Sequence, residues 1–247
     1  MNLVLDHGQG TVDPDLPDSW PQALSDLIQR IDAHALASQY VTDLAVPDEA
    51  DVEIRYVLSG VRVKAFHATR LLPHEGEGIR ANGLRVFGRE LFDDRIECAF
   101  RTGHITEPQR EALHAAHMFA VGEENDRGRR SGVCLALRQA SFGDGSRALL
   151  SNWGGEGIYF SSGASALTPL LQRLGRPAIV VCAAQVMPTQ REQPMYPDLG
   201  KTLLGAWRGL QEGADLFHPD PIPPCDILDI WWPGDAQYDA HPTLPQA

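Results

Sequence analysis

Apolar residues recur every three or four positions near the N-terminus of the chain. The set comprises Trp20, Leu24, Leu27, Ile28, Ile31, Ala35 and Leu36. Because this spacing places the side chains on one face of a helix, it predicts an amphipathic helix over about residues 20–38. Residues 1–18 are rich in Gly, Asp and Pro, which predicts a mobile or loosely docked lead-in. Asp43–Asp51 contains a proline, and we interpret it as a linker.

The period changes to two in Val61–His67, and this alternation of apolar and polar side chains predicts a half-buried strand. A short helix over about Glu75–Ala81 is expected to end at Asn82-Gly83, because glycine readily adopts the left-handed backbone that terminates helices. We expect a second helix over about residues 107–120, capped by Thr106.

The C-terminal half is dominated by short runs rich in Val, Ile, Leu and aromatic residues. These runs predict strands at Gly132–Leu137, Gly157–Ser161, Pro177–Met187 and Asp226–Trp232. Helices are predicted for Ala164–Leu174 and Lys201–Gln211, and the tail from Gly234 is expected to fray. Strands separated by helices without regular alternation predict an α+β fold.

The composition is typical of a folded protein, since 43% of the 247 residues are hydrophobic and 22% are charged. The formal net charge of −12 argues against a protein that coats a nucleic-acid backbone, because neutralising phosphates requires Lys and Arg. The sequence has neither a long apolar window nor a secretory signal, so we expect no membrane span. The cysteines lack CxxC spacing, which predicts free thiols in a reducing, cytoplasmic compartment; they are Cys98, Cys134, Cys182 and Cys225.

Two stretches combine residue types that bind ligands. The first contains Phe66-His67-Ala68-Thr69 and continues to Asn82-Gly83-Leu84. A histidine at a strand end can donate to a ligand hydroxyl, or it can cap the helix that follows. The second is Trp153-Gly154-Gly155-Glu156-Gly157-Ile158-Tyr159-Phe160-Ser161-Ser162. Its glycines and aromatic faces suit close approach and stacking, although a Gly-rich turn entering a core strand has the same composition.

A third stretch, Asp215–Ile230, places Asp215 at the start of a strand, followed by the Pro-rich turn Ile222-Pro223-Pro224 and a second strand. The alternative is a solvated acidic turn, which is common in an acidic chain.

Taken together and in this order, the three stretches resemble the ADP-ribosyltransferase superfamily, closest to its poly(ADP-ribose) polymerase and diphtheria-toxin branch. That branch carries His-Gly-Ser/Thr on a strand, a helix ending in Gly-Leu, then Gly-x-Gly-Ile-Tyr-Phe-Ala/Ser, and finally a catalytic glutamate. Several bacterial members place the acid seven residues before an Ile-Pro-Pro, which is the place of Asp215 here. This chain has Ala68 where the branch has glycine, and aspartate where it has glutamate.

The resemblance implies a split, mostly antiparallel sheet core with flanking helices over residues 51–235. A lead-in and helix would precede it over residues 1–50, and a tail would follow over residues 236–247. It also implies that NAD+ is the substrate and that ADP-ribose passes to an acceptor as nicotinamide leaves.

The implied catalytic acid is Asp215, with Glu212 in reserve; it would orient a ribose hydroxyl and stabilise the oxocarbenium-like transition state. His67 would hold the adenosine ribose, the Ala68 backbone would bond the nicotinamide amide, and Tyr159 would stack on the nicotinamide ring. The implied NAD+-binding residues are His67, Ala68, Thr69, Gly157, Tyr159 and Ser161.

The resemblance leaves the acceptor open. A bacterial mono-ADP-ribosyltransferase would modify a protein or a nucleic acid, and an antitoxin or regulatory partner is compatible with it. The alternatives are an NAD+ glycohydrolase effector or toxin, and a non-catalytic module that binds ADP-ribose or a partner. A metal site is not expected: His104, His114 and His117 lie close in sequence, but no carboxylate or cysteine accompanies them at matching spacing.

Overall fold

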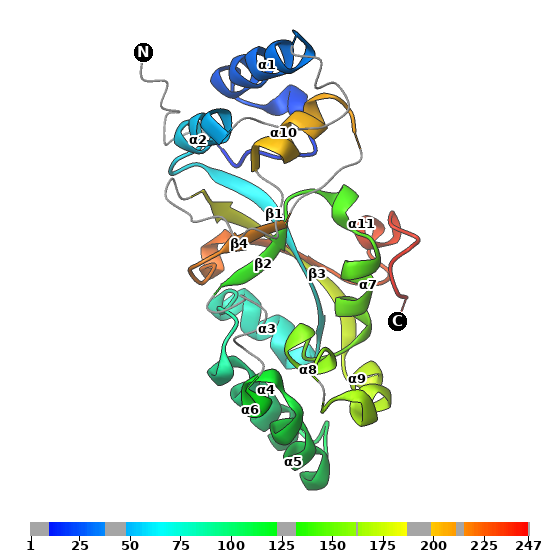
Figure 1. Ribbon diagram of the computed structural model, residues 1–247. Coiled ribbons are helices and arrows are strands. Elements are labelled where there is room, and N and C mark those ends of the chain that lie inside the picture. The colour runs from blue at the N-terminus through cyan, green and yellow to red at the C-terminus, as the bar shows by residue number, and fades with distance from the viewer. Residues whose placement is uncertain are drawn as a thin grey trace. The chain divides into compact units, whose positions relative to one another are not determined.

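A computed structural model describes residues 10–37, 48–122, 132–161, 163–186, 199–210 and 215–246. Within these residues a five-stranded antiparallel sheet is accompanied by helices (Figure 1), which confirms the predicted α+β class. The sheet order is β4-β2-β1-β3-β5, so β1 is central, and its Phe66 pairs with Ala136 of β2. The strands are β1 Arg62–Leu71, β2 Val133–Ala136, β3 Arg176–Gln185, β4 Asp215–His218 and β5 Ile227–Trp231.

The helices cover most of the remaining described chain. They are α1 Gln22–Ala37, α2 Asp48–Val57, α3 Pro73–Asn82, α4 Arg89–Arg101, α5 Glu107–Ala116, α6 Met118–Val121, α7 Asp144–Ser151, α8 Glu156–Tyr159, α9 Thr168–Arg173, α10 Leu199–Trp207 and α11 Ala236–Asp239. The hydrophobic pattern correctly predicted α1, α3, α9 and α10 in position, together with β1, β2, β3 and β5. Helices α4 and α7 were not predicted.

The strand predicted for Gly157–Ser161 is wrong, because this segment begins with the single turn of helix α8. The backbone N–H groups of Ile158 and Tyr159 both donate to the Gly155 carbonyl, at 3.1 and 3.2 Å. Ile158 is fully buried, and a short apolar run is compatible with a buried helical turn as much as with a strand.

The described part of the lead-in is docked, contrary to the expectation. Val12 is buried and bridges to Val63 of β1, and its N–H donates to the Arg62 carbonyl at 2.9 Å.

Three further expectations need correction. The helix predicted over residues 107–120 is interrupted at His117, whose ψ of 152° is extended. Part of the segment interpreted as a linker, from Asp48 onward, belongs to α2. The tail does not fray where α11 forms, since Tyr238 is fully buried and its hydroxyl donates to the Pro245 carbonyl at 2.7 Å.

The chain divides into two compact units. The first comprises Met1–Phe66, Cys134–Ser141 and Cys182–Phe217. Its helices α1, α2 and α10 pack against one another (Figure 1), and Leu24, Leu27 and Ile28 give α1 a buried face. Because these apolar residues lie three and four positions apart, their burial explains why the segment is helical.

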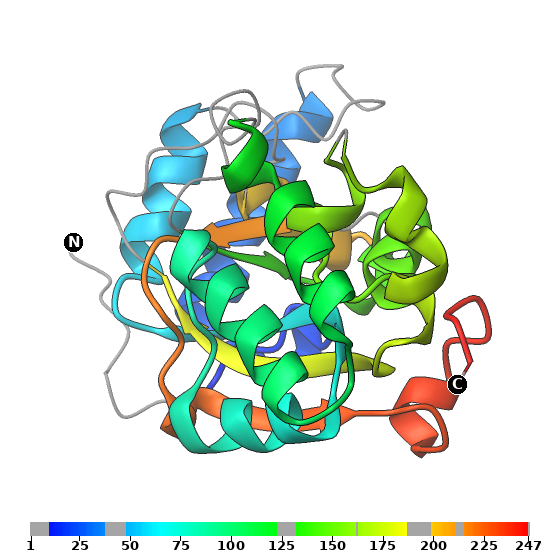
Figure 2. The ribbon, with the colours of Figure 1, turned by 90° about the horizontal axis from the view of Figure 1, so that it is seen from below.

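The second unit comprises His67–Val133, Phe142–Val181 and His218–Ala247. Helices α4 and α5, in green, lie side by side within it (Figure 2). Its core gathers apolar side chains from α4, α5, α8, α9 and neighbouring connecting residues: Leu72, Phe92, Ile96, Ala99, Ile105, Leu113, Trp153, Ile158, Ala164, Leu170, Leu171 and Leu174.

Candidate functional site

The first predicted ligand-binding residues lie on β1, the central strand of the sheet. His67 is half-buried, whereas Ala68 and Thr69 are buried. The prediction that His67 lies at the end of a strand is wrong, because β1 continues for four residues beyond it to Leu71; Leu72 then joins β1 to α3. His67 therefore stands on a strand supported by hydrogen-bonded neighbours on both sides.

The end of the first stretch lies beside the Ile-Pro-Pro of the third. The N–H of Leu84 donates to the Ile222 carbonyl at 2.9 Å, and the N–H of Ile222 donates to the Leu84 carbonyl at 3.0 Å. Gly83 makes this approach feasible: its φ is +83°, and a Cβ there would lie 1.9 Å from the Ile222 oxygen. Segments almost 140 positions apart are thus joined within the second unit.

The first stretch is also joined to the second, through Glu75 of α3. One carboxylate oxygen of Glu75 accepts from Arg95 at 2.6 Å, and the other accepts from the Leu72 N–H at 2.7 Å and from the Trp153 indole N–H at 2.9 Å. Burial opposes ionisation, but Arg95 and the two N–H donors together lower the pKa of Glu75 below its ordinary value. Trp153 immediately precedes the glycines of the second stretch.

The glycine at position 157 is required by packing. A Cβ there would lie 2.0 Å from the Cζ atom of Phe92, so helix α8 can approach α4 this closely only with glycine at 157. Tyr159 packs partly buried against the same core and is tilted on Phe160, with ring centroids 4.3 Å apart. The hydroxyl of Ser161 is buried and has no hydrogen-bond partner among the described residues.

The predicted catalytic acid, Asp215, is the exposed first residue of β4 and belongs to the first unit. It begins a strand, as predicted. The reserve candidate, Glu212, lies outside the described residues.

A second group of polar residues lies between α4 and the end of α5. His114 contacts two carboxylates, with Nδ1 3.2 Å from Asp93 and Nε2 2.8 Å from Glu97. His117 is 1% exposed, and burial lowers the pKa of its imidazole below the ordinary value despite the nearby carboxylate of Asp93.

Sequence reasoning missed this group because its carboxylates lie on α4, which was not predicted. Asp93 and Glu97 are four residues apart and lie on one face of α4. His114 and His117 are three residues apart and lie at the end of α5. The antiparallel packing of α4 and α5 then brings the two pairs together. The spacing of residues within one helix does not predict which other helix packs against it.

Comparisons of the chain with protein-family models, with curated proteins and with solved structures found no match. Among the described residues, no helix combines the length and the apolar character needed to cross a bilayer. The four cysteines are free thiols; Cys182 is buried and Cys225 is exposed.

Proposed function

We propose that the chain is an NAD+-dependent mono-ADP-ribosyltransferase that modifies a macromolecular acceptor and releases nicotinamide. The observation that supports the proposal is the convergence of the motif-bearing stretches. Glu75 accepts from Trp153, and Leu84 pairs with Ile222, so within the second unit the first stretch contacts both the second stretch and the Ile222-Pro223-Pro224 turn of the third. Sequence segments that form one ligand site must meet in space, whereas unrelated turns need not.

Several details of the described residues fit an NAD+-binding role. His67 is half-buried on the central strand of the sheet, where hydrogen-bonded strands on both sides fix the backbone that carries it. Phe160 is 45% exposed beside Tyr159, which provides aromatic surface for stacking. The buried hydroxyl of Ser161 has no partner among the described residues and retains its capacity for a ligand hydrogen bond.

The proposed roles follow the chemistry of each group. His67 would donate to the adenosine ribose, the Ala68 backbone would bond the nicotinamide amide, and Tyr159 would stack on the nicotinamide ring. Asp215 would accept from a hydroxyl of the nicotinamide ribose and stabilise the positive charge that develops as the glycosidic bond breaks. NAD+ supplies the activated ADP-ribosyl group, and nicotinamide leaves with the bonding electrons.

The test is nicotinamide release from NAD+ by the full chain and by single variants. Asp215→Asn is nearly isosteric and should abolish most turnover while NAD+ affinity changes little, because the carboxylate acts chiefly in the transition state. Asp215→Glu restores the side-chain length of the resembled branch and should retain or raise activity. Asp220→Asn, at an exposed acid of the following turn, is the matched control and should be neutral.

The outcomes separate the alternatives. Activity that is lost in Glu212→Gln but kept in Asp215→Asn would move the acid by three residues. Nicotinamide release without labelled ADP-ribose on a protein or nucleic acid would identify a glycohydrolase. A parent chain that binds NAD+ by calorimetry but releases no nicotinamide would overturn the enzyme proposal in favour of a binding module.

A further inference from the structure

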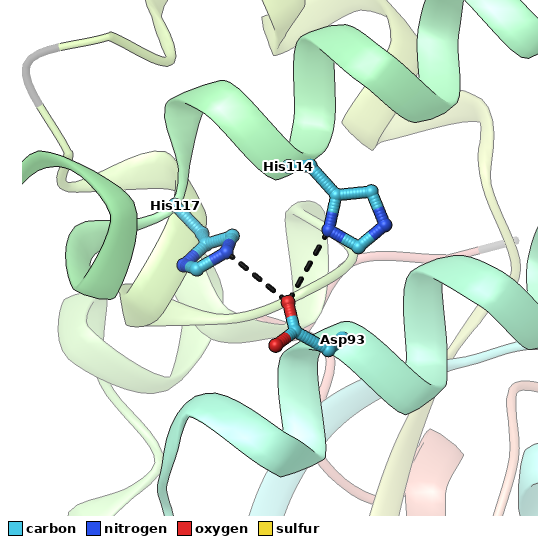
Figure 3. Close-up of side chains that lie close together, drawn as sticks. All are labelled: Asp93, His114 and His117. Atoms are coloured by element: carbon cyan, nitrogen blue, oxygen red, sulfur yellow. Dashed lines mark hydrogen bonds and ion pairs between the residues drawn. The ribbon is translucent and has the colours of Figure 1, made fainter.

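Three potential ligand atoms converge between α4 and the end of α5. Oδ1 of Asp93 lies 3.2 Å from Nδ1 of His114 and 3.4 Å from Nε2 of His117, and all three atoms lie within 4.8 Å of one another. Figure 3 shows both imidazole rings directed at the same carboxylate oxygen. We propose that these three side chains bind a divalent transition-metal ion, with Zn²⁺ as the best fit.

The separations match a coordination shell better than they match hydrogen bonds. Zn²⁺ binds imidazole nitrogen and carboxylate oxygen at about 2.0–2.2 Å in a tetrahedron, whose neighbouring corners then lie roughly 3.3 Å apart. The distances of 3.2 and 3.4 Å from Asp93 to the two rings fall on either side of that value. A hydrogen bond from imidazolium to carboxylate is shorter, about 2.7–2.9 Å.

Glu97 orients the ring of His114 for this role. Its Oε1 lies 2.8 Å from Nε2 of His114, while its other oxygen is 3.8 Å from the Arg110 guanidinium. A neutral ring that donates from Nε2 to Glu97 directs the lone pair of Nδ1 at Oδ1 of Asp93. Two lone pairs facing each other repel unless a cation lies between them, and a carboxylate that holds the distal nitrogen is a recurrent support for metal-bound histidine.

His117 provides a second, independent observation. Its side chain is 1% exposed and stacks on Phe92, with ring centroids 5.9 Å apart and planes inclined by 11°. Its Nδ1 is buried without a hydrogen-bond partner among the described residues, and its Nε2 faces Asp93 at 3.4 Å. A buried imidazole with so few polar contacts is costly. A metal bond at Nε2 would offset part of this cost.

The exposure of the other two residues leaves the site open on one side. The side chains of His114 and Asp93 are 31% and 41% exposed, so an ion can enter and a water molecule can take the fourth position. Two imidazoles and one carboxylate suit Zn²⁺, Co²⁺ or Ni²⁺ and do not suit Mg²⁺ or Ca²⁺, which prefer all-oxygen ligands. The bound ion would clamp α4 to the junction of α5 and α6.

The experiment uses the full chain, freed of metal by a chelator and titrated with Zn²⁺ in a calorimeter. The parent should bind one equivalent of Zn²⁺, and thermal unfolding should shift to higher temperature with Zn²⁺ present. Asp93→Asn and His114→Gln should each weaken Zn²⁺ binding by more than tenfold, and Glu97→Gln by roughly ten- to a hundredfold. His34→Gln, at an exposed histidine of α1, is the matched control and should bind Zn²⁺ as the parent does.

Co²⁺ provides a readout that does not depend on any variant. The parent should give the intense visible bands of four-coordinate Co²⁺ without a thiolate-to-cobalt charge-transfer band, since the proposed ligands include no cysteine. A six-coordinate spectrum, a thiolate band, or Zn²⁺ affinity unchanged in folded Asp93→Asn and His114→Gln would overturn the proposal. Asp93, His114 and His117 would then form only a network of ion pairs and hydrogen bonds.

Discussion

Replacing Glu75 with alanine should destabilise the second unit strongly. The side chains of Glu75 and Arg95 are only 9% and 16% exposed, and their ion pair is 2.6 Å long. Removing the carboxylate leaves the Arg95 guanidinium without its partner and deprives the Leu72 and Trp153 N–H groups of their acceptor. Breaking a buried pair in this way costs about 3–5 kcal/mol of unfolding free energy.

The chain contains a control ion pair of the same length and different burial. Arg85 and Asp94 also form a 2.6 Å ion pair, but their side chains are 45% and 65% exposed. Exposed pairs contribute about 0–1 kcal/mol, because water screens the charges. Asp94→Ala should therefore change the unfolding free energy far less than Glu75→Ala, although each variant removes one carboxylate from an arginine.

The assay is thermal unfolding followed by far-UV circular dichroism. For a chain of this length, each kcal/mol shifts the melting temperature by about 2–4 °C, so Glu75→Ala should lower it by roughly 6–20 °C. The double variant Glu75→Ala/Arg95→Ala should lose less stability than the sum of the single variants, because neither charge is left alone. Equal losses for Glu75→Ala and Asp94→Ala would refute the reasoning that burial, and not distance, gives this ion pair its strength.

Two further predictions concern the same unit. Folding lowers the pKa of Glu75, so its charge stabilises the protein fully above the unfolded pKa of about 4.3 and progressively less as the pH falls through the folded pKa. In urea unfolding, the stability difference between the parent and Glu75→Gln should therefore be constant near neutral pH and shrink in acid. A difference that grows in acid would contradict this sign. Gly83→Ala should destabilise the chain by at least about 1–2 kcal/mol through its positive φ alone, and further through the clash with Ile222. Gly78→Ala lies inside α3, with nothing within 4 Å of the added methyl group, and should instead stabilise the chain by about 0.5–1 kcal/mol in the same unfolding assay. If Gly83→Ala were as stable as the parent, the bridge from Leu84 to Ile222 would be dispensable.

The sequence by itself determined those elements that follow from a regular hydrophobic period or from the backbone needs of a single turn. The helical spacing of Leu24, Leu27 and Ile28 predicted α1, because only a helix places all three on one buried face. The continuous apolar run of β3, buried from Pro177 to Ala184, predicted a strand in the same way. Asn82-Gly83 predicted the end of α3, because the positive φ observed at Gly83 is a local requirement of the turn.

The tertiary structure decided whatever depends on contact between distant segments. Gly157 was interpreted as a ligand-facing or turn residue, yet the close approach of Phe92 explains its identity, and Phe92 lies 65 positions earlier. In the sequence, Glu75 is only one residue of the first stretch. In the structure it is buried beside Arg95 and Trp153 and is a central polar contact of the second unit.

The histidine group shows the same division most clearly. The sequence placed His114 and His117 three positions apart on one predicted helix, but it did not identify Asp93 as their partner. Asp93 reaches them only because α4 and α5 pack side by side, which joins residues 21 positions apart at 3.2 Å. Periodicity describes one helix at a time, whereas the partner of a helix face is selected by the packing of the whole core.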